Sequence, residues 1–361
     1  MFGSRASRRN MKSANDLRTA SGSLVLSRTM AMGLAICGVI LGAQAGCAPL
    51  HPSPTLPPSE WRIATIFEKH DNIAQSLAWH PRGTLVATGD WDGHIYIWDA
   101  RTGTVRAEVA SHKKEVWAVS FSEDERFLVS TDSNTVRIWE VAAQKNFREM
   151  TWQAREEFNA SFTSALFIHQ SRRVALGAVV YSRTGDAAGV YIWDPETQTV
   201  VHEGREYDER GINAIGGSRR IEGIVSGGRD GVVRLWTRGG ASWKRLYTHS
   251  TSVSDLSVSR GQVASCSEDG EVTLYDAELG RILWKTRLPD RGTAVAVSHD
   301  GEYVAAANSD GSVFVCRATD GSKVFEANAH KGKVCRIAFA PEDYRFASSG
   351  ADGKAVVWSP K

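Results

Sequence analysis

One short segment recurs along this chain of 361 residues and constrains its fold more than any other feature. Residues 88–103 contain a strand-like run, a tight Asp92-Gly93 turn, a second run that ends in Trp98-Asp99, and an exit turn. Asp-Gly between two runs of strand-forming residues is a strong short-range signal of a β-hairpin. A lone hairpin cannot bury its apolar face in water, so we expect this one to need copies of itself.

Six further copies follow along the chain. Four of them repeat the Asp-Gly turn and the terminal aromatic residue or its substitute, at 230–236, 269–275, 310–316 and 352–358, and two weaker copies end at Trp139 and Trp193. The seven end positions are 98, 139, 193, 236, 275, 316 and 358, so all the gaps except the one of 54 residues are 39 to 43 residues long. Such a period, about 40–45 residues with four strands per unit, is typical of WD40 repeats.

The chain therefore resembles the WD40 family over residues 60–361. The resemblance implies an all-β fold, a seven-bladed WD40-type β-propeller. The last repeat stops after its third strand, whereas residues 61–69 read as an outer strand with no first three strands before it. Because an open ring would leave unpaired strand edges, we expect this N-terminal strand to pair beside the strand ending at Trp358 and to close the propeller.

The family resemblance also implies a buried polar set in each blade, made of a loop His, a Ser or Thr, a turn Asp and the Trp. The sets expected here are His70, Thr88, Asp92 and Trp98 in blade one; His249, Ser265 and Asp269 with Tyr275 in blade five; and His330, Ser348, Asp352 and Trp358 in blade seven. Three blades depart from this pattern. Blade six has Ala306 and Cys316, blade three has an insertion at 182–189 in place of the tight turn, and blade two has no Asp-Gly to match His112.

The N-terminus is expected to be a secretory signal peptide, residues 1–46, followed by a Pro-rich linker, residues 47–59. A basic leader precedes an apolar run at 30–45 that is shorter than a membrane-spanning helix, and the run ends in small residues. Cleavage before Cys47 would give a lipid-anchored protein on the outer side of a bacterial membrane. Cleavage after Ala45 would give a secreted protein, and a retained anchor or a misassigned start is the third possibility.

Charge and motifs narrow the classes of function. Residues 1–28 hold six of the 43 basic residues and one of the 41 acidic ones, so the remainder carries 37 basic and 40 acidic residues, a balance of −3. This balance gives no electrostatic footprint for nucleic acid. Five scattered cysteines form no disulfide framework and no metal spacing. We found no catalytic or cofactor-binding motif, so no cofactor and no metal are predicted.

A partner-binding surface is expected on the ring face formed by the loops before the inner strands. One position per blade points there: Gln75, Trp117, Thr163, Gly211, Ser254, Thr293 and Cys335. The predicted protein-binding patch consists of Trp91, Lys113, Lys114, Trp117, Arg210 and Arg229. Aromatic residues beside cations suit such a patch, because interface cores are enriched in Trp and Arg. The alternative is that Trp117 packs inward and the lysines are only solvated.

Three functions are compatible with this sequence. The first is a monomeric, non-enzymatic scaffold that binds an unidentified protein. The second is a propeller enzyme, quinoprotein-type or hydrolytic, which would need converging polar side chains in a channel whose strands offer mostly Ala, Val, Ser and Phe. The third is an envelope-assembly factor, because residues 274–289, with Gly280 before Trp284, resemble a docking motif of quinoprotein-type propellers, a group that includes a non-catalytic lipoprotein of outer-membrane protein assembly.

Overall fold

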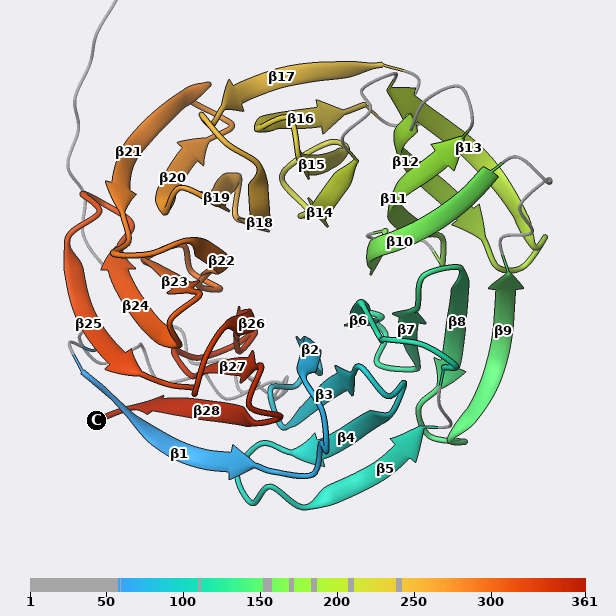
Figure 1. Cartoon of the computed structure of the whole chain (residues 1–361), viewed down its shortest axis with the longest axis horizontal. Helices are drawn as coiled ribbons and strands as arrows, with labels where there is room; N and C mark the ends of the chain where they lie inside the picture. The colour runs from blue at the N-terminus through green and yellow to red at the C-terminus, as the bar shows by residue number, and fades with distance from the viewer. Residues whose placement is uncertain are drawn as a thin grey trace, which may run out of the picture. The chain divides into compact units, whose positions relative to one another are not determined.

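Seven antiparallel sheets of four strands each are arranged around a central axis, as Figure 1 shows. The computed structural model describes Pro58 and residues 60–109, 112–151, 158–168, 172–182, 187–206, 211–237 and 242–361. These described residues contain 28 strands and no helix. The all-β, seven-bladed propeller predicted from the sequence is therefore confirmed.

Each blade contributes one strand to each of four concentric positions (Figure 1). The innermost strands are β2 (Ala74–Trp79), β6 (Ala118–Phe121), β10 (Phe158–Phe167), β14 (Ile212–Gly216), β18 (Val253–Ser259), β22 (Gly292–Val297) and β26 (Val334–Phe339). The second strands are β3 (Leu85–Asp90), β7 (Phe127–Thr131), β11 (Val174–Ser182), β15 (Ile224–Gly228), β19 (Gln262–Ser267), β23 (Tyr303–Asn308) and β27 (Phe346–Gly350). The third strands are β4 (Ile95–Asp99), β8 (Thr135–Glu140), β12 (Ala187–Asp194), β16 (Val232–Trp236), β20 (Glu271–Asp276), β24 (Ser312–Arg317) and β28 (Ala355–Pro360). The outermost strands are β1 (Trp61–Phe67), β5 (Val105–Val109), β9 (Lys145–Thr151), β13 (Thr199–Glu206), β17 (Trp243–Thr248), β21 (Arg281–Arg287) and β25 (Lys323–Asn328).

The middle strands are buried on both faces because each blade stacks against two neighbours. All six residues of β23 are buried, for example, whereas the outermost β25 alternates between exposed and half-buried positions. The tight turns between the second and third strands pack just as closely. At Gly93, φ is +92° and a Cβ atom would lie 2.2 Å from the His112 carbonyl oxygen, so only glycine fits this turn.

The N-terminal strand closes the ring as expected. Strand β1 pairs antiparallel with β28, from Trp61 opposite Pro360 to Phe67 opposite Ala355. Two aromatic side chains of β1 fasten it to both neighbouring blades. The Trp61 indole packs edge-on against Tyr303 of blade six at a centroid distance of 5.4 Å, and Phe67 stacks on Trp98 of blade one at 4.7 Å.

Blade three differs from the expected loop insertion. Residues 187–189 belong to strand β12 and pair with 178–180 of β11. The insertion therefore lengthens the hairpin, because its small residues Ala187, Ala188 and Gly189 continue the strand ladder. The tip of this hairpin, residues 183–186, lies outside the described residues.

Several predictions from the sequence concern residues that the structure does not describe. The signal peptide, Cys47 and most of the Pro-rich linker are among them, and so is Arg210 of the predicted patch. Within the part of the chain that the structure describes, no helix is long and apolar enough to span a membrane.

Candidate functional site

A β-bulge recurs at the same place in six of the seven inner strands. In blade one, Ala74 pairs with Asp90 and Ser76 pairs with Gly89, which leaves Gln75 unpaired between them. The corresponding unpaired residues in the other blades are Thr163, Asn213, Ser254, Thr293 and Cys335. Because a bulge redirects the side chain of the extra residue, this repeated feature decides which side chains face the axis of the ring.

All six bulge residues line one cavity of about 370 Å³, together with Trp117 of blade two. We call this cavity the channel mouth. It contains six of the seven positions expected from the sequence, and the seventh expectation, Gly211, is wrong. Gly211 precedes its inner strand, where its carbonyl accepts the Arg229 amide, and the bulge after Ile212 gives the place in the mouth to Asn213.

Beyond the mouth, the inner strands line an axial channel with a cavity of about 250 Å³. Most of its wall is formed by Ala, Val and Ser side chains, as expected, together with Leu and Ile in place of most of the expected Phe. One ionic pair also lies within it. Arg336 of blade seven donates to Asp255 of blade five at 2.9 Å, and the Val295 amide of blade six donates to the same carboxylate at 3.1 Å. Burial raises the pKa of the Asp255 carboxyl, against the effect of Arg336. The pair therefore links three blades at the axis.

This pair was not predicted from the sequence, although the sequence contains a signal for it. Asp255 and Arg336 each directly follow a bulge residue, at the position that is Ser76 in blade one and Ala214 in blade four. Aligning the repeats at that position would have placed both side chains in the channel. No group of three or more His, Cys, Asp or Glu side chains suited to hold a metal ion occurs among the described residues.

Three exposed cations surround the channel mouth: Arg229, Arg291 and Lys333. None of them forms an ion pair with a described residue, and Glu268 is the acidic side chain that lines the mouth with them. The Arg229 side chain is held by Asn213, because its Nε donates a hydrogen bond to the Asn213 Oδ1 at 3.3 Å. Arg229 was predicted from the sequence; Arg291 and Lys333 were missed, although each stands two residues before a predicted mouth position.

The structure brings together only part of the predicted patch. Trp117 is half-buried and lines the mouth, and Trp91 is 41% exposed and donates its indole N–H to Gln75 at 3.3 Å. Trp117 is therefore part of the mouth without being fully buried. Lys113 and Lys114 are exposed but do not line the mouth.

The buried polar sets of the blades were the other sites expected from the sequence. In blade seven the four expected residues are joined: His330 contacts Asp352 and Ser348 at 2.9 Å each, and the Trp358 indole donates to Ser348 at 3.2 Å. Such a set is tolerated in a core because each polar atom has a partner.

Blade one uses a different carboxylate from the expected one. His70 contacts Thr88 at 2.7 Å and Asp90 at 2.8 Å, and Trp98 donates to Thr88 at 3.2 Å. The expected Asp92 is exposed in the turn and accepts from Asn72 instead. Asp90 takes its place because it ends strand β3 and is fully buried, two residues after Thr88.

Blade two has a complete set that was not predicted from the sequence. His112 contacts Ser130 at 2.7 Å and lies 3.1 Å from Asp132, and the Trp139 indole donates to Ser130 at 2.8 Å. Asp132 stands two residues after Ser130, the same spacing as Thr88 and Asp90. The expected sets placed the carboxylate in an Asp-Gly turn, so Asp132 was not assigned to the set of blade two.

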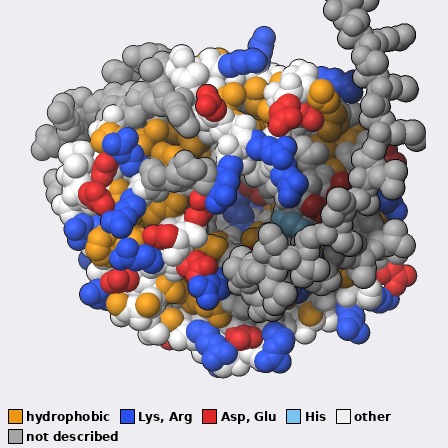
Figure 2. All heavy atoms as spheres, turned by 180° about the vertical axis from the view of Figure 1, so that it is seen from behind, with side chains coloured by type: hydrophobic (Ala, Val, Ile, Leu, Met, Phe, Trp, Pro, Cys, Tyr) orange, Lys and Arg blue, Asp and Glu red, His pale blue; other side chains and the backbone are white. Residues whose placement is uncertain are grey.

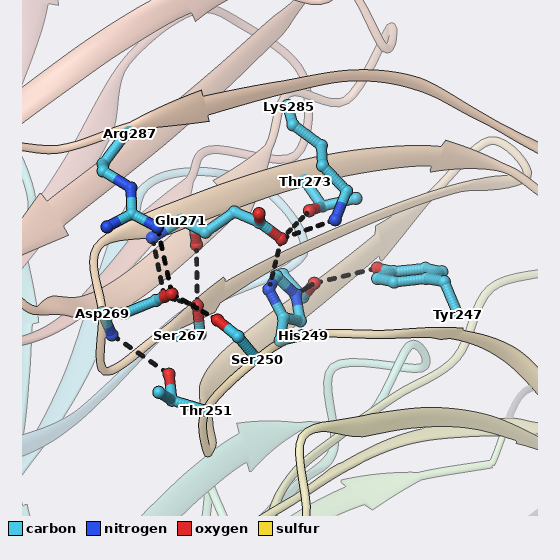
Figure 3. Close-up of polar contacts among 11 residues, drawn as sticks. Tyr247, His249, Ser250, Thr251, Ser267, Asp269, Glu271, Thr273, Lys285 and Arg287 are labelled. Carbon is cyan, nitrogen blue, oxygen red and sulfur yellow. Dashed lines mark hydrogen bonds and ion pairs between the residues drawn. The ribbon is translucent and has the colours of Figure 1, made fainter.

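Blade five also departs from expectation, as Figure 3 shows. His249 contacts Ser265 at 2.6 Å, and its other ring nitrogen lies 2.9 Å from Glu271. The hydroxyl that replaces the Trp indole belongs to Tyr247, which lies 2.9 Å from Ser265, whereas the expected Tyr275 packs against the Tyr247 ring at 5.2 Å.

Asp269, expected in this set, contacts other groups (Figure 3). Its carboxylate accepts from Ser250 and Ser267 at 2.6 Å each and lies 3.1 Å from Arg287. The longer side chain of Glu271 reaches the histidine instead. The Ser265-His249-Glu271 order resembles a nucleophile with its base, but Ser265 is fully buried and equivalent sets occur in blades one, two and seven. Its role is therefore structural.

Blade six lacks a polar set, and a tryptophan from blade five covers it. Leu288 occupies the position of the entry histidine, since its amide bonds to Gly270 as the His249 amide bonds to Gly231. The Trp284 indole donates to the Ala318 carbonyl at 2.8 Å and lies against Gly321, where a Cβ atom would be 2.9 Å from the ring. Trp284 thus joins two neighbouring blades.

Two known family models match two different parts of the ring. The model of the family "WD domain, G-beta repeat" matches residues 61–99 and 103–140. These matches support a WD40-type propeller. A second family model, "Outer membrane protein assembly factor BamB", matches residues 224–357, the part that contains the Trp284 contact.

Several similar curated proteins come from eukaryotes. Protein tipD of Dictyostelium discoideum is 23% identical over 307 residues, which cover 80% of this chain and 47% of the relative. Periodic tryptophan protein 2 of Arabidopsis thaliana is 26% identical over 284 residues, 75% of this chain and 30% of the relative. The target of rapamycin complex subunit wat1 of Schizosaccharomyces pombe is 20% identical over 287 residues, 76% of this chain and 74% of the relative. The chain thus spans less than half the length of the first two.

Proposed function

We propose that this propeller is a non-enzymatic scaffold that binds a partner protein at the channel mouth. One observation carries the proposal: the repeated bulge aims one side chain from each of six blades into a single cavity, and Trp117 completes the ring from the seventh. Because sheet ladders fix the backbone on both sides of each bulge, a partner would meet a surface that needs little ordering on binding.

The composition of the mouth suits a protein partner. Trp117 is half-buried at the rim, the exposed Trp91 is tied to the bulge residue Gln75, and Arg229 is held in place by Asn213. Partly exposed tryptophans and oriented arginines are the residue types that contribute most to protein–protein affinity. The match of the WD domain, G-beta repeat model to residues 61–99 and 103–140 supports the same proposal.

The test is capture of partners by the full-length protein and by two tryptophan variants. Trp117→Ala removes the largest side chain of the mouth, and Trp243→Ala removes an exposed tryptophan from the outermost strand β17. We expect a partner that is lost with Trp117→Ala and kept with Trp243→Ala, while both variants retain the native circular dichroism spectrum. Equal capture by the two variants would remove the basis of the proposal.

We further propose that the propeller is exported and anchored by a lipid on Cys47. The support is the order of a basic leader, an apolar run at 30–45 and a small-residue exit before this cysteine. The intact mass of the protein purified from membranes would decide between the possible N-termini. A lipid-modified Cys47 is the expected result, and an N-terminus at Gly46 or at Met1 would contradict it.

A second candidate function is that of an envelope-assembly factor. Two observations favour it: the family match over residues 224–357, and the Trp284 contact between blades five and six. Deleting the gene in its host and measuring the abundance of outer-membrane proteins would test it. Lower abundance is expected if this role holds. An absorbance spectrum of the purified protein tests the enzyme alternative, because a bound quinone absorbs in the near ultraviolet and visible range.

A further inference from the structure

We propose that the partner segment bound at the channel mouth is acidic, and that Arg229, Arg291, Lys333 and Arg336 bind its carboxylates. This inference rests on the proposed scaffold function and specifies the chemistry of the partner. It comes from the distribution of charge inside the mouth, from the unused hydrogen-bond donors of Arg336 and from the fixed backbone positions of the exposed cations.

The mouth has a charge opposite to that of the rest of the ring. Four basic side chains and Glu268 line it, so the local charge is +3, or +2 when Asp255 below Arg336 is included. The chain beyond residue 28 carries 37 basic and 40 acidic residues. A concave site lined mostly by charges of one sign concentrates the electric field and attracts ligands of the opposite sign.

Arg336 lies between the mouth and the axial channel, and most of its donors are unused. A guanidinium has five N–H donors, and Arg336 makes one hydrogen bond within the described residues, from Nη1 to Asp255 at 2.9 Å. Its side chain is 19% exposed. A half-buried guanidinium with free donors matches a carboxylate, which binds such a fork through two parallel hydrogen bonds.

The backbone holds the exposed cations at the mouth in fixed places. The Lys333 carbonyl accepts the Ala351 amide at 2.9 Å, and the Arg291 carbonyl accepts the Ser309 amide at 3.0 Å. Arg229 is fixed through its side chain, because Asn213 accepts its Nε and donates in turn to the Val253 carbonyl of blade five at 2.8 Å. An extended acidic segment would therefore find the cations already placed.

A protein segment fits this site better than a nucleic acid. The cations lie within one cavity, whereas a nucleic-acid surface needs a basic patch or stripe that follows the phosphate backbone. On the face shown in Figure 2, Lys and Arg side chains are interspersed with Asp and Glu over the coloured part of the surface. The mouth also contains hydroxyl and amide side chains, such as Ser254, Thr293 and Gln75, which can bind peptide groups.

The test measures the binding of labelled peptides to the full-length protein by fluorescence anisotropy. The probes are a short peptide of alternating Glu and Ser, the same peptide with Gln in place of Glu, and a single-stranded oligonucleotide. The variant Arg291→Ala/Lys333→Ala removes two exposed cations of the mouth. The control Lys244→Ala/Arg281→Ala removes two exposed, unpaired cations from the outermost strands β17 and β21 and gives the same change in net charge.

We expect the Glu peptide to bind, the Gln peptide to bind about tenfold more weakly or not at all, and added salt to weaken the Glu complex. The mouth variant should bind the Glu peptide about tenfold more weakly, whereas the control should change its affinity less than twofold. Equal affinity for the Glu and Gln peptides, or equal loss in the two variants, would overturn the inference. So would a preference for the oligonucleotide that depends on Arg291 and Lys333.

The partner capture described above separates this inference from the scaffold function. A partner that is lost with Trp117→Ala but binds the Arg291→Ala/Lys333→Ala variant unchanged would leave the scaffold in place and exclude the acidic segment. If no partner depends on Trp117, the scaffold function itself fails, whatever the peptides do. A partner that is lost with both variants supports the two conclusions together.

Discussion

Replacing Asp90 should destabilise the propeller far more than replacing Asp92, its neighbour in the same turn. Asp90 is fully buried, and its carboxylate lies 2.8 Å from His70 and accepts the Asp92 and His94 amides at 3.0 and 2.8 Å. Burial alone would raise the pKa of Asp90, but these hydrogen bonds outweigh it and lower the pKa below the usual range. The carboxylate is therefore charged and strongly held in the native blade.

The magnitudes follow from what each substitution leaves behind. Asp90→Ala leaves His70 without its carboxylate partner and two turn amides without an acceptor, in a site closed to water. We therefore expect the free energy of unfolding to fall by about 3–5 kcal/mol. Asp90→Asn keeps an acceptor for the amides and should lose about half as much. Asp92 is exposed and accepts one hydrogen bond, from Asn72, so Asp92→Ala should change stability by less than about 0.5 kcal/mol.

Urea unfolding followed by tryptophan fluorescence measures these differences, because Trp98 shares the network through Thr88. Hydrogen exchange of the β3–β4 hairpin supplies a local readout, and its amides should exchange faster in Asp90→Ala than in Asp92→Ala. Equal midpoints for the two Ala variants would refute the assignment of Asp90 as the carboxylate of blade one. A larger loss from Asp92→Ala would restore the position expected from the Asp-Gly turn.

Three further predictions follow from buried groups. Burial lowers the pKa of His249, so its neutral form stabilises the fold above pH about 6.5, and the urea midpoint should fall as the pH drops below that value; a flat profile from pH 8 to 5 would contradict this. Trp61→Ala removes the contact with Tyr303 and the indole hydrogen bond to Tyr344, and should cost about 3–5 kcal/mol in thermal or urea unfolding. Cys266 is fully buried, which raises the pKa of its thiol, so a thiol reagent should modify it only after denaturation.

The fold could be predicted because the information for it is repeated. Most of the hairpins carry both the Asp-Gly turn and a terminal aromatic residue, so a departure in a single blade, such as the insertion at 182–189, does not alter the ring. The closure by residues 61–69 could be predicted by counting strands. The last repeat lacks an outer strand, and the N-terminal residues 61–69 supply one that has no first three strands before it. Here the sequence pattern and the physical requirement to pair every strand point to one answer.

The polar sets and the mouth could be predicted only in part, because they depend on register. Whether the carboxylate comes from Asp90, from Asp352 or from Glu271 depends on how far each side chain reaches from the turn, and the spacing differs between blades. The bulge determines that Asn213, and not Gly211, enters the mouth. A one-residue shift in a strand exchanges the two faces, so a small error in register changes which residue is assigned to the site.

Blade six contacts its two neighbours through outer-strand aromatic residues, Phe325 on one side and Trp284 on the other. In blade six, Phe325 pairs with Val315, the residue before Cys316, and it packs against Trp358 of blade seven at a centroid distance of 5.7 Å. Trp284 holds the equivalent outer position in blade five, where it pairs with Leu274, and it belongs to the same apolar cluster as Cys316. The small side chain at 316 therefore leaves room for the Trp284 indole.

This arrangement predicts that a tryptophan cannot be restored to blade six while Trp284 is present. Cys316→Trp should overpack the site and cost about 1–3 kcal/mol, whereas Trp284→Ala should leave a cavity and cost about 3–5 kcal/mol. In the double variant the new indole can fill the vacated space, so the double loss in urea unfolding should be smaller than the sum of the single losses by about 1 kcal/mol or more. The matched control combines Cys316→Trp with Trp243→Ala, whose side chain lies on the distant outer strand β17, and this pair should be additive. Additive losses for Cys316→Trp and Trp284→Ala as well would show that the two side chains do not share one space, and that the absence of a tryptophan from blade six has a different cause.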